Sequence, residues 1–256
     1  MLASGLKRQL AEGGALVGSW LALGDQAVAE IMARAGFDFL VIDMEHAPIS
    51  VESASALIRT IELAGGNPMV RLPDADPSLI KTLLDSGAHG IVVANVSSAE
   101  GARAAVRATR YPPEGIRGVG LHRAQGYGES FTEYFTQANS SILVVVQIES
   151  ASGVAAADEI AGVDGIDAMM IGPYDLSADL GVPGDFTCTP FIEAVETVRR
   201  AARLAGVATG VHVVEPDREA VLAGLRDGHR FMVYSVDMRI ISVGARAGAS
   251  IPRSPL

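Results

Sequence analysis

Ionisable side chains follow directly on an apolar segment near the start of the chain. Residues 39–42 are all apolar, and Asp43, Glu45 and His46 come just after them. Charged groups at the end of a buried segment are unfavourable unless they are paired, solvated or bound to a ligand. We therefore interpret this junction as part of a functional site. Histidine titrates near neutral pH, so His46 is the predicted proton-transfer group.

The same pattern recurs along the chain. Further apolar runs lead into Arg71, into Gln147 and Glu149, into Asp175 and into His212. Two carboxylates suit a hard divalent cation such as Mg²⁺ or Mn²⁺, so Glu149 and Asp175 are the predicted metal ligands. Arg71 would stabilise a substrate oxygen that develops negative charge.

Structural explanations compete for some of these residues. Asp43 alone could cap a helix, and His212 alone could be a hydrogen-bonded core side chain. We expect Arg117, in a glycine-containing segment without the spacing of a dinucleotide-binding loop, to order that segment. The remaining histidines, interpreted as structural or surface residues, are His89, His122 and His229.

Eight strand-like runs alternate with helix-like runs and must position these side chains. The predicted strands span residues 15–20, 39–42, 68–71, 90–94, 142–148, 168–171, 207–213 and 231–236. The predicted helices span residues 26–35, 51–64, 77–86, 98–109, 153–160, 190–205 and 218–227. Serial βα units imply parallel strands, and eight of them close a (β/α)8 TIM barrel with its active site at the carboxyl ends of the strands.

The length of the chain favours the same α/β fold. Its 256 residues are close to the roughly 250 of a typical (β/α)8 barrel, so we expect a single domain over residues 1–256. The largest gap between predicted strands, at about residues 111–141, is expected to lie over the barrel mouth as a loop or short helices. The tail, residues 239–256, is expected to be partly disordered or docked on a neighbouring molecule.

The composition excludes several classes of protein. The net charge is −10 and no cluster of Lys and Arg is present, which argues against a nucleic-acid partner. No apolar run reaches the roughly 18 residues of a membrane span, and residues 1–10 lack the apolar core of a signal peptide. The single cysteine, Cys188, rules out an internal disulfide and fits a reducing cytoplasm. We therefore expect a soluble, cytoplasmic protein.

Five motifs in order resemble the signatures of the HpcH/HpaI aldolase family. They are DMEHAP at residues 43–48, VRLP at 70–73, TRYPPEGIRGVG at 109–120, VQIE at 146–149 and IGPYDLS at 171–177. The resemblance spans nearly the whole chain, and it implies a metal-dependent, pyruvate-type class II aldolase on a (β/α)8 barrel.

The resemblance also implies roles for individual residues. Glu149 and Asp175 would hold Mg²⁺ or Mn²⁺, with Co²⁺ or Zn²⁺ as alternatives. Arg71 would stabilise the enolate, and His46, paired with Asp85, would transfer protons.

Other implied roles concern the substrate and the assembly. Gln147 would support the metal shell or the substrate, and the backbone around Gly172, Tyr174 and Asp175 would bind the pyruvate carboxylate. The family often assembles as hexamers that exchange a C-terminal helix, so we expect a homo-oligomer, either a trimer or a hexamer.

Three positions depart from the family pattern. Tyr174 stands where a small residue is usual, Ala94 and Asn95 stand where Pro-Met is usual, and His212 stands where an apolar residue is usual. We expect these side chains to line the substrate pocket.

The expected reaction is reversible aldol cleavage of a 4-hydroxy-2-oxo acid to pyruvate and an aldehyde. Aldolases use either a lysine Schiff base or a metal ion. Lys7 and Lys81 are the only lysines and neither lies at a predicted strand end, which favours the metal route. Two alternatives remain open: a CoA-thioester lyase of the citrate or malyl-CoA lyase type, and a non-catalytic barrel that binds keto acids.

Overall fold

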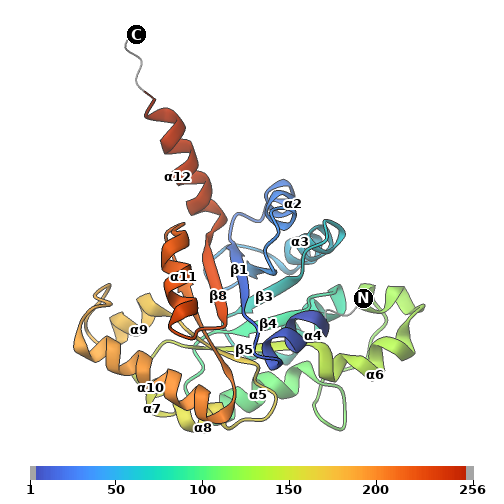
Figure 1. Ribbon diagram of the computed structural model, residues 1–256. Coiled ribbons are helices and arrows are strands. Elements are labelled where there is room, and N and C mark those ends of the chain that lie inside the picture. The colour runs from blue at the N-terminus through green and yellow to red at the C-terminus, as the bar shows by residue number, and fades with distance from the viewer. Residues whose placement is uncertain (1–3, 252–256) are drawn as a thin grey trace.

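Eight parallel strands form a closed barrel at the centre of the molecule (Figure 1). The computed structural model describes residues 4–251. The strands are β1 (Leu16–Leu21), β2 (Phe39–Asp43), β3 (Pro68–Leu72), β4 (Gly90–Val93), β5 (Leu143–Ile148), β6 (Ala168–Ile171), β7 (Ala208–Val213) and β8 (Phe231–Val236). Each strand pairs with the next, and β8 pairs with β1. The predicted (β/α)8 TIM barrel is confirmed.

Helices surround the barrel. They are α1 (Ser4–Ala11), α2 (Gln26–Arg34), α3 (Val51–Leu63), α4 (Pro77–Ser86), α5 (Ala99–Thr109), the 3₁₀ segment η1 (Arg123–Gly128), α6 (Phe131–Ser141), α7 (Ala151–Ala155), α8 (Ala157–Ala161), α9 (Pro173–Asp179), α10 (Thr189–Ala205), α11 (Arg218–Arg226) and α12 (Asp237–Ala249). The single helix predicted over residues 153–160 is wrong, because the chain forms α7 and α8, separated at Ala156.

Capping residues set the helix ends that place the site. The Asp76 carboxylate accepts hydrogen bonds from the backbone N–H groups of Ser78 and Leu79 at the start of α4. Gly87 ends the same helix with φ of 108°, a left-handed conformation that favours glycine. The helix therefore returns the chain from the carboxyl end of β3 to the amino end of β4.

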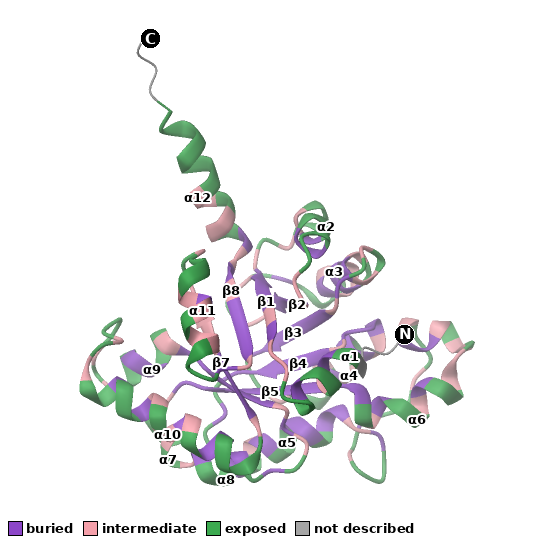
Figure 2. Cartoon of the chain, in the orientation of Figure 1, coloured by how far each residue is buried: buried purple, intermediate pink, exposed green. Residues whose placement is uncertain are grey.

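The barrel strands are mostly buried (Figure 2), and a cluster of apolar side chains fills the barrel interior. The rings of Phe39 on β2 and Phe231 on β8 stack with centroids 4.4 Å apart. A Cβ atom on Gly18 of β1 would lie 2.3 Å from the Phe39 ring, so only glycine fits there. Because this core fills the barrel interior, a ligand would have to bind at an end of the barrel.

The insertion at residues 111–141 does not lie over the barrel mouth as expected. It connects α5 to β5, and helices of such a barrel run back toward the amino ends of the strands. Its side chains accordingly contact the end of α4: Arg117 donates to Asp85, and Arg123 donates to the Ser86 carbonyl oxygen. The insertion therefore lies toward the amino end, where η1 packs on α4 and α6 packs on α1.

Arg117 has the structural role that the sequence suggests. Its side chain is fully buried, and its guanidinium carbon lies 4.6 Å from the Tyr111 ring centroid and 5.5 Å from that of Tyr134. One Nη atom donates to Asp85 at 2.6 Å and to the Tyr134 hydroxyl at 3.0 Å. These contacts fasten the insertion to α4.

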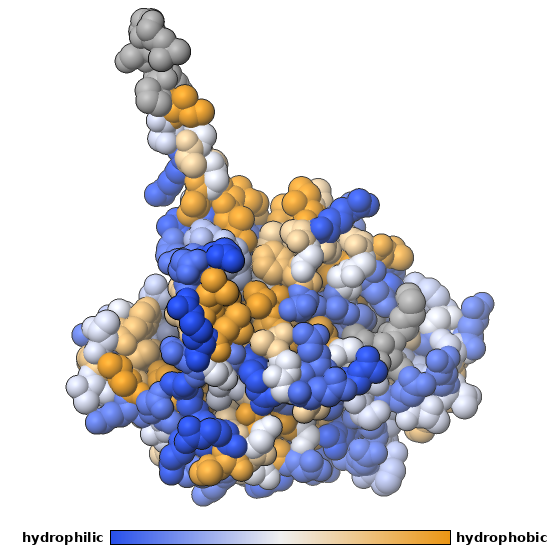
Figure 3. Space-filling model, in the orientation of Figure 1, coloured by the Kyte–Doolittle hydropathy of each residue, from blue (hydrophilic) through white to orange (hydrophobic). Residues whose placement is uncertain are grey.

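The last helix, α12, projects from the barrel (Figure 1) and is largely exposed along its length (Figure 2). Apolar surface gathers where it leaves the body (Figure 3), and Met238 and Ile241 are about half exposed. Within the tail expected to be partly disordered or docked on a neighbouring molecule, residues 239–249 are helical, and residues 252–256 lie outside the described part. No helix among residues 4–251 is both long and apolar enough to span a bilayer.

Candidate active site

Alternation along the strands gathers the candidate residues at the carboxyl end of the barrel. Successive side chains of a strand point to opposite faces. Phe39 and Val41 belong to the interior cluster, so Asp43 also faces inward. Met69 is interior as well, so Arg71 faces inward. The same alternation adds the inward-facing residues Trp20, Gln147 and His212.

A bidentate ion pair joins Arg71 to Asp43. The Arg71 Nε and Nη2 atoms donate to the two Asp43 carboxylate oxygens at 2.9 and 2.6 Å. The same carboxylate accepts from the backbone N–H groups of Glu45 and His46. Burial alone would raise the pKa of Asp43, but Arg71 and these N–H groups lower it below the ordinary value. Asp43 therefore stays charged and holds Arg71 in one orientation.

Trp20 packs on the other side of the arginine. The Arg71 guanidinium carbon lies 4.2 Å from the Trp20 ring centroid, a cation–π contact. The edge of Trp20 meets the His212 ring at 5.8 Å between centroids. Trp20 thus connects β3 to β7 across the site. It is the only tryptophan in the sequence, but no sequence pattern shows that its ring lies against Arg71.

Glu45 lies between the arginine and the predicted proton-transfer histidine. Its Oε2 atom is 3.3 Å from Arg71 Nε and 3.4 Å from His46 Nε2. This oxygen is buried yet makes no hydrogen bond. Burial raises the pKa of Glu45, against the opposing charges of Arg71 and His46. The His46 side chain is 56 % exposed, so it faces solvent from the rim of the site.

Glu149 is the most strongly perturbed carboxyl of the site. One of its oxygens accepts from the Asn95 backbone N–H at 2.6 Å, and the other accepts from the Gln147 amide. Asn95 has φ of 52°, a conformation that asparagine tolerates better than most residues. Burial and the charge of Glu45 raise the pKa of Glu149 to about 7, with a smaller contribution from Asp175. Asn95 is one of the positions that depart from the family pattern, and here its backbone contacts the site through Glu149.

Gly172 allows the chain to approach Glu149 closely. A Cβ atom at this position would lie 2.6 Å from the Glu149 Oε2 atom and 2.8 Å from the Gln147 Nε2 atom. Gly172 also caps α9, whose first turn carries the exposed Asp175. The predicted metal pair is thus brought to the carboxyl ends of neighbouring strands, β5 and β6.

The oxygen donors fit a divalent cation bound with open positions. Glu45 follows β2, and Glu149 and Asp175 follow the neighbouring strands β5 and β6, so all three carboxyl groups lie at the carboxyl end of the barrel. The buried Glu45 Oε2 atom, which lies within ion-pair distance of Arg71 and His46 but makes no hydrogen bond, is a further oxygen donor. Among residues 4–251, however, no three His, Cys, Asp or Glu side chains converge into a ready-made cage. Water and substrate oxygens would complete the coordination.

Asp85 does not meet His46 within one chain. Asp85 lies in the last turn of α4, at the amino end of the barrel, and receives its hydrogen bond from Arg117. His46 follows β2 at the carboxyl end. The predicted pairing is therefore absent from the chain as described, because helix and strand run in opposite directions.

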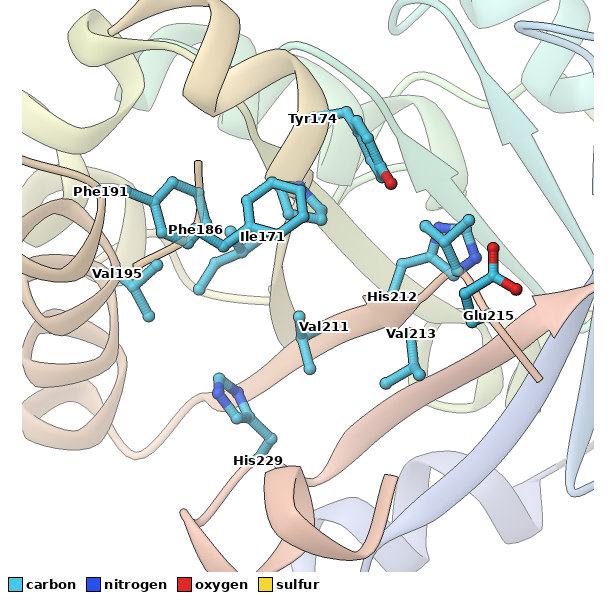
Figure 4. A pocket seen from close by; sticks show the side chains of 12 residues that line it. Ile171, Tyr174, Phe186, Phe191, Val195, Val211, His212, Val213, Glu215 and His229 are labelled. Carbon is cyan, nitrogen blue, oxygen red and sulfur yellow. The ribbon is translucent and has the colours of Figure 1, made fainter. Parts of the chain in front are cut away.

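An apolar pocket of about 350 Å³ lies beside β7, lined by residues 211–214 and by side chains that follow β6 (Figure 4). Tyr174 and His212 line it, as do Phe186 and Phe191. The Tyr174 ring meets Phe186 edge-on at 5.1 Å. The charged residues Arg71 and Glu149 do not line this pocket, so the polar chemistry belongs to the barrel end itself. Neither lysine lies in the site: Lys7 pairs with Asp167 at the amino end of β6, and Lys81 is in α4.

Comparisons with known proteins agree with this geometry. The family model described as HpcH/HpaI aldolase/citrate lyase matches residues 16–242. A hydroxypyruvate/pyruvate aldolase of Roseovarius nubinhibens is 40 % identical over 94 % of this chain and 93 % of its own length. A 4-hydroxy-2-oxovalerate aldolase of Rhodococcus jostii is 41 % identical over 92 % and 91 %. A solved HpcH/HpaI aldolase/citrate lyase family structure from Burkholderia cenocepacia has a TM-score of 0.92, at 36 % identity, covering 98 % of this chain and 100 % of that one.

Proposed function

Because the chain belongs to the HpcH/HpaI aldolase/citrate lyase family, we propose that it catalyses the metal-dependent, reversible cleavage of 4-hydroxy-2-oxo acids to pyruvate and an aldehyde. The aldolase names of its relatives support a carbon–carbon lyase. The observation that carries the proposal is the buried Arg71, which is clamped by Asp43, lies 3.3 Å from the Glu45 carboxylate and stands at the same end of the barrel as Glu149.

Glu149 and Asp175 would hold the cation, with Gln147 fixing the Glu149 carboxylate. A bound divalent cation supplies Lewis acidity that polarises a ketone. The fit rests on the oxygen-only donor set and on the buried Glu45 Oε2 atom, which makes no hydrogen bond. Mg²⁺ and Mn²⁺ suit such donors best.

The residues of the chain supply the remaining chemistry. The Arg71 guanidinium faces the space where a keto oxygen gains negative charge, and it is already oriented before substrate binds. His46 lies at the solvent edge beside Glu45, which suits proton exchange between the site and water. Gly172, Tyr174 and Asp175 begin α9, and their backbone is the proposed site of the pyruvate carboxylate.

A substrate panel tests the proposal directly. Purified protein would be incubated with Mn²⁺ or Mg²⁺ and a series of 4-hydroxy-2-oxo acids, and pyruvate release would be followed with lactate dehydrogenase. We expect release that stops after exhaustive chelation and returns when metal is added. Retained activity without metal would overturn the metal role, and no release from any member would overturn the reaction.

The CoA-thioester alternative receives less support. The chain is acidic and has no cluster of Lys and Arg for the CoA phosphates. A solved citrate synthase is 29 % identical with a TM-score of 0.85 over 96 % of each chain, so other carbon–carbon chemistry occurs on closely similar barrels. A malyl-CoA type ester in the same panel separates the two activities. Binding of pyruvate without exchange of its methyl protons would favour the non-catalytic alternative.

We also infer that the protein is a homo-oligomer, a trimer or hexamer. The half-exposed Met238 and Ile241 on the projecting α12 support this inference, because apolar surface of this kind is usually covered by a partner. Light scattering coupled to size-exclusion chromatography would measure the assembly, and a monomer at micromolar concentration would contradict it.

A further inference from the structure

His212 is an inward-facing side chain in the same layer as Arg71. It lies on β7 opposite Val233 of β8, and its ring meets the edge of Trp20 at 5.8 Å between centroids. Trp20 in turn lies against Arg71 at 4.2 Å. The imidazole is therefore one side chain away from Arg71, the proposed oxyanion-stabilising group.

One ring nitrogen of His212 is occupied and the other is not. The main chain of Ser235 forms a hydrogen bond with the ring, while the Nε2 atom is buried and has no partner among the described residues. A buried polar atom without a partner is unfavourable, so its persistence calls for an explanation. A ligand in the site would provide the missing hydrogen bond.

The strand next to His212 is shaped to hold the ring. Ser235 has φ of 51°, and the pairing of β8 with β1 shifts at this point, as in a β-bulge. The Ser235 hydroxyl donates to the Val214 carbonyl oxygen at 2.8 Å, and its own carbonyl oxygen accepts from the Ser19 hydroxyl at 3.4 Å. The Ser235 main chain is thus fixed from both sides, and so is the imidazole bonded to it.

The ring is neutral near neutral pH. Burial, and then the charge of Arg71, lower the pKa of His212 to about 4, against the raising effects of Ser235 and Asp43. In a neutral imidazole one nitrogen carries a proton and the other accepts hydrogen bonds. Because the Ser235 main chain takes up the N–H, Nε2 is left as a fixed acceptor. Its natural partner is a hydrogen-bond donor, such as a hydroxyl group.

We propose that the Nε2 atom of His212 accepts a hydrogen bond from a substrate hydroxyl group, so that the site prefers hydroxylated substrates over their deoxy counterparts. The hydroxyl has two possible sources: the carbon next to the keto group of the donor acid, or the carbon next to the aldehyde group of the acceptor. The inference rests on the proposed aldolase activity and adds to it a specificity-determining residue.

The test compares substrates that differ by one hydroxyl group. The reference reaction joins pyruvate and acetaldehyde; one arm replaces pyruvate with hydroxypyruvate, and the other replaces acetaldehyde with glycolaldehyde. In His212→Phe, which keeps an aromatic ring beside Trp20, we expect the kcat/KM ratio of hydroxylated to deoxy substrate to fall about tenfold in one arm. The arm that changes identifies the source of the hydroxyl.

The chain offers a matched control. His229 is also buried, its Nδ1 atom has no partner among the described residues, and burial likewise lowers its pKa to about 4. It precedes β8 at the amino end of that strand and, like His212, lines the apolar pocket, but it makes no ring contact with Trp20. His229→Phe should leave both ratios as in the native protein, whereas His212→Gln, which restores an acceptor oxygen, should recover part of the lost preference.

Several outcomes would contradict the proposal. Equal changes for all substrates, or unchanged ratios in both arms, would remove the specificity role while leaving the aldolase activity standing. Absence of all activity in the native protein would instead refute the proposed function. If the variants fold poorly, a native crystal soaked with Mn²⁺ and hydroxypyruvate, or with Mn²⁺, pyruvate and glycolaldehyde, decides the matter: a hydroxyl beyond about 3.5 Å from Nε2 in both would overturn it.

Discussion

Arg71 and Asp43 are register partners on neighbouring strands, and two hydrogen bonds of 2.9 and 2.6 Å join their side chains. Both face the barrel interior, so the arginine cannot turn away without breaking a buried pair. This arrangement presents a positive charge at a fixed position, which is what stabilisation of a developing oxyanion requires.

Removing this charge should slow the reaction strongly. We expect Arg71→Ala to lower kcat by roughly 10²–10³, as loss of an oxyanion donor does elsewhere. Asp43→Asn should leave the positive charge of Arg71 in place but hold its guanidinium less firmly, so we expect a smaller loss of kcat. Steady-state kinetics at saturating metal measure both. Full activity of Arg71→Ala would contradict the role of Arg71.

Adding one methyl group at Gly172 should weaken metal binding. In Gly172→Ala the new Cβ would press on Glu149 and Gln147, at 2.6 and 2.8 Å. Overpacking of this kind costs about 1–3 kcal/mol, so we expect the Kd for Mn²⁺ to rise roughly ten- to hundredfold. Gly101→Ala in α5 is the control, because the atom nearest to the new Cβ would be 3.6 Å away. Unchanged Mn²⁺ affinity in Gly172→Ala would exclude this carboxylate as a ligand.

Metal affinity should depend on pH through Glu149. Its pKa is raised to about 7, and a carboxylic acid must lose its proton to bind a cation. Affinity should therefore fall about tenfold for each pH unit below 7 and level off above it. Isothermal titration with Mn²⁺ from pH 5.5 to 8 measures this slope. Glu149→Gln should bind Mn²⁺ more weakly and lose the dependence, and a flat native profile would argue against the assignment.

Acid should destabilise the fold through its buried histidines. The pKa of His229 falls to about 4 in the folded state, mainly through burial, from an ordinary value of 6.5. The unfolded chain therefore binds more protons below pH 6.5, and stability is lost as pH falls toward 4. Between pH 7.5 and 5 we expect a loss of about 2 kcal/mol from this residue. Urea unfolding at each pH, with chelator present, measures the free energy of unfolding of the native protein and of His229→Phe. If the two free energies depend on pH in the same way, the prediction is refuted.

The Asp85–Arg117 pair should stabilise the fold. Arg117 has no exposed side-chain surface, so Asp85→Ala would leave a buried charge unpaired, at a cost of about 3–5 kcal/mol in the free energy of unfolding. The exposed pair of Arg200 and Asp158 is the control, and Asp158→Ala should cost less than about 1 kcal/mol. Lost turnover with unchanged stability would instead support the proton-transfer role predicted for Asp85.

Much of the site could be predicted because its signals are local. Eight βα units in series imply a parallel barrel, and an apolar run that ends in a polar residue marks the carboxyl end of a strand. Arg71, Glu149 and His212 are therefore found at that end, as expected. The strand boundaries agree within one or two residues for the same reason, since side-chain alternation and flanking turns are encoded along the chain.

The tertiary structure alone decided which of these groups touch. No sequence pattern shows that Trp20 contacts Arg71, or that the Asn95 backbone donates to Glu149, because each contact joins segments on different strands. Asp85 pairs with Arg117 rather than His46 because helix α4 carries it to the far end of the barrel. The sequence by itself determined which end of each strand is polar; the closure of the barrel decided how those ends meet, since only closure sets distances across its axis.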